Sequence, residues 1–205
     1  SMFAVTFTAN RDSRWLYEIL QFLYKHIEEL NQAEFASLFK DFLEKMAVRY
    51  AEGRLFTEED IIKKYGDIPV YAFNFIDYIL WKNREELGRK YKGVKFDHFK
   101  FAYRRSIEHW FPQHPNSDEK IEKMDDQFLH SFGNLCIITD SQNSKFGNLV
   151  PSAKYKQWEG IFDRQSLKLQ IMANITEKTK WESYQIKGLE KEILPMVKRF
   201  IESKS

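Results

Sequence analysis

Apolar residues recur at intervals of three and four along the first part of the chain, and this spacing constrains the fold more than any other feature. Residues spaced in this way lie on one face of a helix, which needs a partner to cover it. One stripe comprises Trp15, Leu16, Ile19, Leu20, Leu23, Ile27 and Leu30, and the next comprises Phe35, Leu38, Phe39, Phe42, Leu43, Met46 and Tyr50. Such stripes are usually core, so we expect residues 1–88 to form a helical subdomain without chemistry of its own.

Capping residues divide this helical part. Gly53 is suited to end the second helix. Thr57, followed by three acidic residues, predicts the start of a short third helix that Gly66 closes. A fourth apolar stretch, residues 70–87, follows Pro69.

The pattern changes after residue 88. A connection over residues 88–106 with seven Lys and Arg leads into an alternating run, residues 106–112, which predicts a strand stopped by proline. A polar loop follows to about residue 127, and residues 132–139 predict a second strand because they are apolar and partly β-branched. Asp140 and Ser141 are suited to cap a short helix beginning near Gln142. The remaining residues again indicate helices, the last of them bent or divided at Pro195.

Composition limits the classes of protein that the chain can represent. With 205 residues, 43% of them hydrophobic, it can bury a sizeable core, and it contains no apolar run long enough to cross a membrane. Cys136 is the single cysteine, which excludes a disulfide within the chain and a four-thiolate zinc site and favours the cytoplasm. Residues 1–88 carry 11 Lys and Arg against 15 Asp and Glu, whereas residues 89–205 carry 21 against 15. A basic second part is compatible with a nucleic-acid surface.

The strand, loop, strand and helix carry residues suited to phosphodiester hydrolysis. This reaction needs a base that deprotonates water and a Lewis acid that stabilises the leaving oxygen. Histidine suits the first role, and a divalent cation held by oxygen ligands suits the second. Glu108 and His109 are neighbours on the first predicted strand, so their side chains point in opposite directions and can serve different partners.

Three segments around these residues resemble the HNH (His-Me finger) nuclease module at the C-terminus of GmrSD-type modification-dependent restriction enzymes. They are Ile107-Glu108-His109-Trp110-Phe111-Pro112-Gln113, Leu129-His130-Ser131-Phe132-Gly133-Asn134-Leu135 and Gln142-Asn143-Ser144-Lys145-Phe146-Gly147-Asn148. The resemblance is specific over about residues 105–156, and Trp110 departs from it because an aliphatic residue is commoner after the histidine. Asn134 and Asn143 lie nine residues apart, as the corresponding residues do in HNH nucleases generally.

The resemblance implies a role for each residue. His109 would be the general base, Glu108 and Asn143 the metal ligands, and Asn134 the residue that braces the loop around His109. Further residues expected to contact substrate or close the site are Arg105, Lys145, Asn148 and Lys154. Two oxygen ligands favour one Mg²⁺ or Mn²⁺ per site over zinc. His114 and His130 are interpreted as a loop imidazole and a packing or hydrogen-bonding residue.

We therefore expect an α+β fold, mostly α-helical, with an embedded ββα-metal (HNH) centre. Residues 1–88 would form the helical subdomain, residues 89–160 the nuclease core and residues 161–205 the helices that pack on it. The resemblance implies a DNA endonuclease in restriction or anti-phage defence, joined in the full-length protein to an upstream nucleotide-hydrolysing domain, and a homodimer would allow double-strand cleavage. A non-catalytic DNA-binding module and a helical interaction module remain the alternatives.

Overall fold

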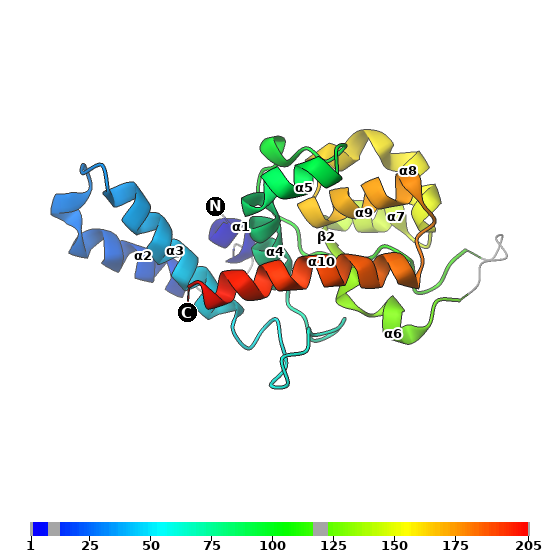
Figure 1. The fold of residues 1–205 in the computed structure, drawn as a ribbon, viewed down its shortest axis with the longest axis horizontal. Helices are drawn as coiled ribbons and strands as arrows, with labels where there is room; N and C mark the ends of the chain where they lie inside the picture. The colour runs from blue at the N-terminus through cyan, green and yellow to red at the C-terminus, as the bar shows by residue number, and fades with distance from the viewer. Residues whose placement is uncertain (1, 8–12, 117–122, 205) are drawn as a thin grey trace.

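A computed structural model describes residues 2–7, 13–116 and 123–204, and these residues form many helices around a small sheet (Figure 1). The α-helices are α1 (Met2–Phe7), α2 (Arg14–Lys25), α3 (Phe35–Ala51), α4 (Val70–Lys82), α5 (Arg84–Lys90), α6 (Asp126–Leu129), α7 (Asp140–Phe146), α8 (Pro151–Trp158), α9 (Leu167–Lys178) and α10 (Ser183–Glu202). The strands are β1 (Ser106–His109) and β2 (Leu135–Ile138), and the 3₁₀ helices are η1 (Ile27–Glu29), η2 (Phe96–His98), η3 (Phe132–Asn134) and η4 (Glu159–Arg164). This combination of many helices with a two-stranded sheet confirms the expected α+β class.

The two strands pair antiparallel, with Glu108 opposite Cys136 and His109 opposite Leu135. All of β2 is buried, whereas in β1 only Glu108 and His109 are. Helix α7 follows β2 directly, so the chain has the predicted order of strand, loop, strand and helix. Part of the predicted loop, residues 117–122, lies outside the described residues.

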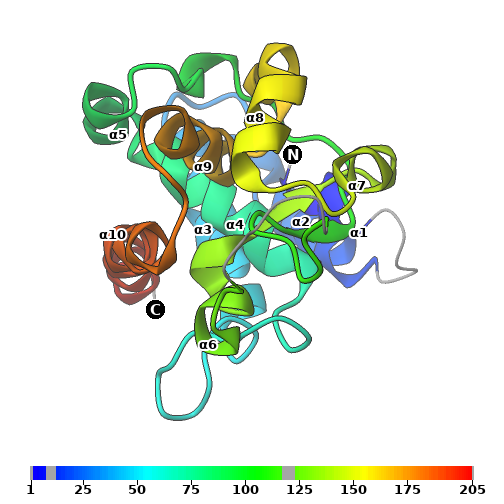
Figure 2. The same ribbon diagram turned by 90° about the vertical axis from the view of Figure 1, so that its right-hand side faces the viewer.

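Helix α4 is the centre of the hydrophobic core. It contacts α1 and α3 on one side of the molecule and β2, α9 and α10 on the other (Figures 1 and 2). Nearly every side chain from Tyr71 to Leu80 is buried, as expected for a helix that is apolar on all sides. One core therefore extends from the N-terminal helix to α10, and the division at residue 88 stays a prediction.

The hairpin of α2 and α3 projects from this body (Figure 1). Phe22 packs against Phe42 with ring centroids 4.1 Å apart, but no residue of α2 is buried. The large apolar side chains left exposed in this hairpin are those of Leu16, Tyr17, Leu20, Tyr24, Ile27, Leu30 and Leu38. The expectation that this stripe is core is therefore wrong for most of α2, because α3 covers it only in part, although Trp15 stacks on Phe3 of α1 with ring centroids 6.1 Å apart.

The predicted helix that starts at Thr57 is absent from the structure. Its residues form a turn closed by a bridge between Phe56 and Ile62, and the amide of Thr57 donates to the carbonyl of Ile61 over 2.8 Å. Asp60 has a φ of 60°, which no right-handed helix accommodates. A helix of this length has a costly nucleus, and pairing of Lys63 with the carbonyl of Leu55 satisfies the backbone instead.

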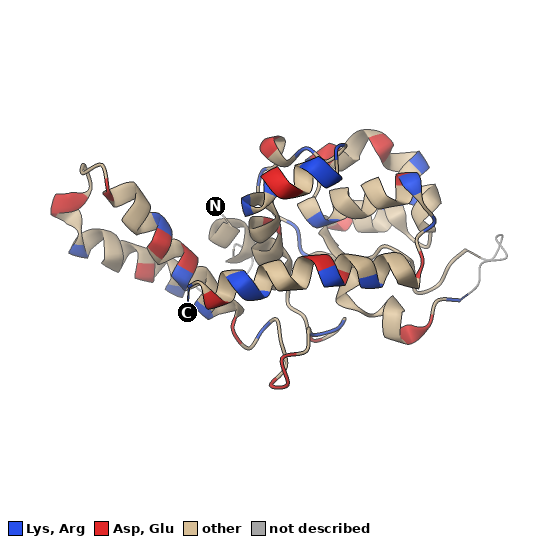
Figure 3. Ribbon diagram, viewed as in Figure 1, with Lys and Arg blue, Asp and Glu red and all other residues tan. Residues whose placement is uncertain are grey.

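Two further boundaries differ from the predictions. Thr139, and not Asp140 or Ser141, caps α7 through a reciprocal capping box with Gln142. Helix α10 continues through Pro195 without division. Figure 3 shows Lys and Arg interspersed with Asp and Glu along α5 and α10, and among the described helices none is long and apolar enough to cross a membrane.

Candidate active site

A pocket of about 380 Å³ lies at the end of β1. Its lining residues are Tyr65, Ile107, Glu108, His109, Pro112, Gln113, His114, Asn143, Gly147 and Asn148. Strand β1 contributes Glu108 and His109, and α7 contributes Asn143. The chain leaves α7 at Gly147, whose φ of 48° is a left-handed conformation that favours glycine. Four of the predicted site residues, Glu108, His109, Asn143 and Asn148, therefore line one pocket although they come from separate segments.

Glu108 is buried and forms an ion pair with Lys154 of α8. The Nζ of Lys154 lies 2.5 Å from Oε1 of Glu108, and it also donates to the backbone oxygens of His109 (2.8 Å) and Trp110 (2.9 Å). Burial raises the pKa of Glu108 and lowers the pKa of Lys154, and the attraction between the two charges opposes both shifts. This pair fixes the orientation of the carboxylate at the wall of the pocket.

The position of Lys154 differs from the one expected for a substrate contact. Its side chain is completely buried, and its three N–H groups already donate to three protein oxygens. An ammonium group has three donors and no more. The structure therefore leaves Lys154 no hydrogen for a phosphate, and its contacts are those of a residue that positions Glu108 and the backbone beside it.

The imidazole of His109 lies between two hydrogen-bonding partners. Its Nε2 is 3.1 Å from Nδ1 of His130, and its Nδ1 is 3.1 Å from the side-chain nitrogen Nε2 of Gln113. Burial lowers the pKa of His109 to about 4, and electrostatic repulsion from the neighbouring His130 and Lys154 adds to the shift. His109 is therefore neutral near pH 7, with a lone pair that can accept a proton.

Two aromatic contacts complete the surroundings of His109. The ring of Tyr65 lies edge-on to the imidazole of His109 at 4.4 Å between centroids and is stacked on His130 at 5.9 Å. The amide of Tyr65 also donates to the carbonyl of His130. The N-terminal part thus supplies a wall of the pocket, which corrects the expectation that it has no part in the site. No pattern around Tyr65 in the sequence indicates this contact.

Asn134 is fully buried behind the pocket and bonds the loop after β1. Its Oδ1 accepts from the amide of Phe111 (2.9 Å) and from the indole of Trp181 (3.1 Å). Its Nδ2 donates to the carbonyls of Phe111 (3.0 Å) and Leu129 (2.9 Å). These bonds join the residues following His109 to the segment before β2, which is the arrangement that a bracing residue requires.

The other predicted substrate contacts lie away from this pocket. Lys145 is on another face of α7, where its Nζ lies 5.5 Å from the ring centroid of Trp158. Arg105 is exposed and its Nε donates to Asp140 over 2.5 Å. Neither side chain lines the pocket of Glu108 and His109.

The pocket offers oxygen donors suited to a hard cation. Glu108 supplies a carboxylate and Asn143 a carboxamide, both on the pocket wall. Among the described ranges no three His, Cys, Asp or Glu residues converge as a metal-binding group. A site with two protein oxygen ligands fits Mg²⁺ or Mn²⁺, which retain several waters, better than zinc, which prefers nitrogen and sulfur in a closed shell.

Comparison with known families assigns the chain to the restriction nucleases. The matching family is described as GmrSD restriction endonucleases, C-terminal domain, and the match covers residues 56–195. Because this is more than half of the chain, the chain belongs to that family, as the motifs indicated. The match includes Tyr65 and the whole pocket but leaves out α2 and α3. Neither the curated proteins nor the solved structures contain a significant match.

Proposed function

We propose that this domain is a metal-dependent DNA endonuclease of the HNH type, which hydrolyses phosphodiester bonds in the pocket at the end of β1. The observation that supports this most strongly is that Glu108, His109 and Asn143 line a single pocket. The three residues come from a strand pair and the helix that follows it. The family, whose members are restriction endonucleases, supports the same chemistry.

In this mechanism His109 is the general base. Its low pKa keeps the imidazole neutral, and Nδ1 is the nitrogen beside Gln113 on the pocket wall. A water that enters the pocket replaces the side-chain amide of Gln113 as the hydrogen-bonding partner of Nδ1. The water transfers a proton to Nδ1 as it attacks phosphorus. His130, in contact with Nε2, holds the ring in the orientation that this transfer needs.

Glu108 and Asn143 would hold one Mg²⁺ or Mn²⁺, and a cation bound there supplies a Lewis acid for the phosphate and the leaving oxygen. Lys154 keeps the Glu108 carboxylate directed to the pocket wall. Asn134 acts indirectly, by holding the backbone after His109 in place.

The proposed biological role is restriction of foreign DNA in the cytoplasm, as part of a larger protein that carries an upstream nucleotide-hydrolysing domain. This role follows the family and not a feature of the pocket. One metal site cuts one strand at a time, so double-strand cleavage would use two copies of the domain or two successive cleavage events.

The test is cleavage of supercoiled plasmid with Mg²⁺ or Mn²⁺, with EDTA as the blank. We expect wild type to nick the plasmid and His109→Ala to lose about 100-fold or more of the rate. His98→Ala is the matched control, because His98 lies in η2 and does not line the pocket at the end of β1. Asn143→Ala should lose cleavage, and higher metal concentration should restore part of it.

Two outcomes would reject the nuclease. DNA binding that persists in His109→Ala, with no cleavage by either protein, favours a non-catalytic DNA-binding module. Absence of salt-dependent DNA affinity favours a helical interaction module. A crystal soaked with Mn²⁺ provides an independent check, since density is expected between Glu108 and Asn143.

A further inference from the structure

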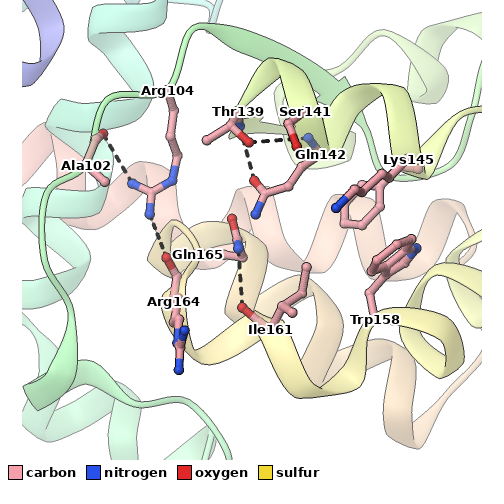
Figure 4. Close-up of a pocket in the computed structure, with 11 residues that line it drawn as sticks. Ala102, Arg104, Thr139, Ser141, Gln142, Lys145, Trp158, Ile161, Arg164 and Gln165 are labelled. Atoms are coloured by element: carbon pink, nitrogen blue, oxygen red, sulfur yellow. Dashed lines mark hydrogen bonds between the residues drawn. The ribbon is translucent and has the colours of Figure 1, made fainter.

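A second pocket, of about 330 Å³, lies beside α7 and is separate from the one at the end of β1 (Figure 4). It is bounded by α7, by η4 and by the segment that leads into β1. Its lining residues are Ala102, Arg104, Thr139, Ser141, Gln142, Lys145, Phe146, Trp158, Ile161, Arg164 and Gln165. The two pockets use different faces of α7, since Asn143 lines the first and Gln142 and Lys145 line the second.

Three cationic residues and no carboxylate line the second pocket, and Figure 4 shows the side chain of Arg164 directed away from Gln142 and Lys145. Within the described ranges, none of Arg104, Lys145 and Arg164 forms an ion pair. The nearest acidic residue along α7, Asp140, is bonded to Arg105 and Ser106. A concave surface with uncompensated positive charge attracts anions.

Arg104 is the most unusual of the three, because only 2% of it is exposed. Its guanidinium donates to the carbonyls of Ala102 (3.5 Å) and Arg164 (2.8 Å), and Asp77 acts on it from beyond ion-pair distance. Burial lowers the pKa of Arg104 without removing its charge. A buried arginine held by two neutral carbonyls is a fixed positive charge at the pocket wall.

Neutral donors accompany these charges. The Gln142 side chain accepts from the amide of Thr139 over 3.2 Å, which leaves its own amide nitrogen directed into the pocket (Figure 4). On the opposite wall the side-chain amide of Gln165 donates to the carbonyl of Ile161 over 3.3 Å, and the ammonium group of Lys145 extends from α7 (Figure 4). Phosphate groups in nucleic acids are bound by this combination of Lys or Arg and amide donors.

We propose that this second pocket binds a phosphate group of DNA. This phosphate belongs to the same strand as the phosphate that is hydrolysed, at a neighbouring position. The proposal rests on the proposed function, because it assumes that DNA reaches the pocket at the end of β1. The two pockets lie on different faces of α7, and an α-helix with its side chains is about 10–12 Å across, which is the rise of about three base pairs. One short stretch of backbone can therefore occupy both pockets, and the second contact fixes the register of the strand.

The experiment measures DNA affinity against salt concentration without divalent metal, so that binding is separated from cleavage. For Lys145→Gln we expect the slope of log K against log salt to fall by about 0.9, which corresponds to about eightfold weaker binding at 0.1 M salt. Lys145→Arg, which keeps the positive charge, should retain the wild-type slope. Lys25→Gln, which removes an exposed charge from α2, is the matched control and should change neither.

A titration with inorganic phosphate distinguishes the source of the anion. Phosphate binding that Lys145→Gln abolishes, with DNA affinity unchanged, would overturn the proposal in favour of a free anion. A salt slope for Lys145→Gln equal to that of wild type, together with no phosphate binding by wild type, would overturn the proposal outright. If wild type nicks DNA and Lys145→Gln has the same salt slope as wild type, only this inference fails. If the slope of Lys145→Gln is smaller and neither protein nicks DNA, only the proposed nuclease activity fails. Wild type without DNA affinity would reject both.

Discussion

The Nζ of Lys154 lies 2.5 Å from Oε1 of Glu108, and both side chains are buried. Lys154 reaches this carboxylate from α8, 46 residues further along the chain. Through its two other bonds it also holds the carbonyls of His109 and Trp110. A single ammonium group thus orients both the proposed metal ligand and the backbone that carries the proposed base.

Replacing Lys154 by methionine removes the only cation bonded to Glu108 in the part of the chain that the structure describes. We expect Lys154→Met to lower the free energy of unfolding by about 3–5 kcal/mol at neutral pH, because a buried carboxylate remains without its partner. Burial raises the pKa of Glu108, so the folded variant binds this proton more tightly than the unfolded chain. Its stability should therefore increase as the pH falls from neutral towards the pKa of an exposed carboxyl group.

Urea unfolding at neutral and mildly acidic pH measures this effect. The double variant Lys154→Met/Glu108→Gln should recover most of the loss, since it removes the uncompensated charge. Equal stability of Lys154→Met and wild type at neutral pH would show that the pair contributes nothing to folding.

Asn134 provides a second test of how the loop after β1 is held. Asn134→Ala deprives four buried groups of a hydrogen-bonding partner, on Phe111, Leu129 and Trp181. We expect a loss of about 3 kcal/mol or more, because each unsatisfied buried group costs about 1–3 kcal/mol. Trp181→Phe removes just one of these bonds, and denaturant unfolding should give it the smaller loss. The reverse order would contradict the bracing role.

Sequence could indicate the segments of the candidate site because they are encoded locally. The order of β1, β2 and α7 follows from two short β-prone runs and a capped helix close together along the chain. An antiparallel pair brings the end of the first strand beside the start of the second, so Glu108 and His109 could be expected near Asn134. The roles of these residues stay predictions.

Sequence could not indicate the contacts that depend on packing between distant segments. Lysine is almost never fully buried unless it is paired, so Lys154 was expected at the substrate and not behind the carboxylate. Tyr65 reaches His109 only because the turn before α4 folds back over the pocket. At residues 57–66 local helix signals were overridden by the bridge between Phe56 and Ile62, which nothing in the local pattern encodes.

Gly133 allows α10 to approach η3 closely, and this contact gives a third prediction. A Cβ at Gly133 would lie 2.5 Å from the carbonyl oxygen of Ile186 and 2.9 Å from Cγ of Glu190. The amide of Gly133 also donates to Glu190 over 2.7 Å. Gly133→Ala should therefore lower the free energy of unfolding by about 2–3 kcal/mol, since backbone must move to relieve the overlap.

Gly188 supplies the matched control for Gly133, because it lies in α10 and a Cβ there would meet nothing within 4 Å. Gly188→Ala should raise stability by up to about 1 kcal/mol through helix propensity. Thermal unfolding of both variants distinguishes a close contact from a general intolerance of alanine. A loss at Gly188 as large as that at Gly133 would contradict the packing argument.

Glu44 provides a pH-dependent prediction away from the candidate site. Burial by itself would raise the pKa of this carboxyl group, but bonds from Lys204 (2.8 Å), Lys82 (2.6 Å) and Tyr78 (2.6 Å) outweigh it and lower the pKa to about 2. A depressed pKa means that the unfolded chain binds the proton more tightly. The resulting stability is present above the unfolded pKa of 4.5 and is lost as the pH falls towards about 2.

Glu44→Gln should therefore destabilise the fold by about 2 kcal/mol at neutral pH, allowing for screening by solvent. The difference from wild type should shrink by more than half between about pH 5 and about pH 3, because the unfolded wild-type chain takes up a proton at Glu44 there while the folded protein keeps the carboxylate ionised, and the variant has no carboxyl group to titrate. Denaturant unfolding across this range measures the difference directly. A difference that stays constant with pH would mean that Glu44 stabilises the packing of α3 by its shape and hydrogen bonds, and not by its charge.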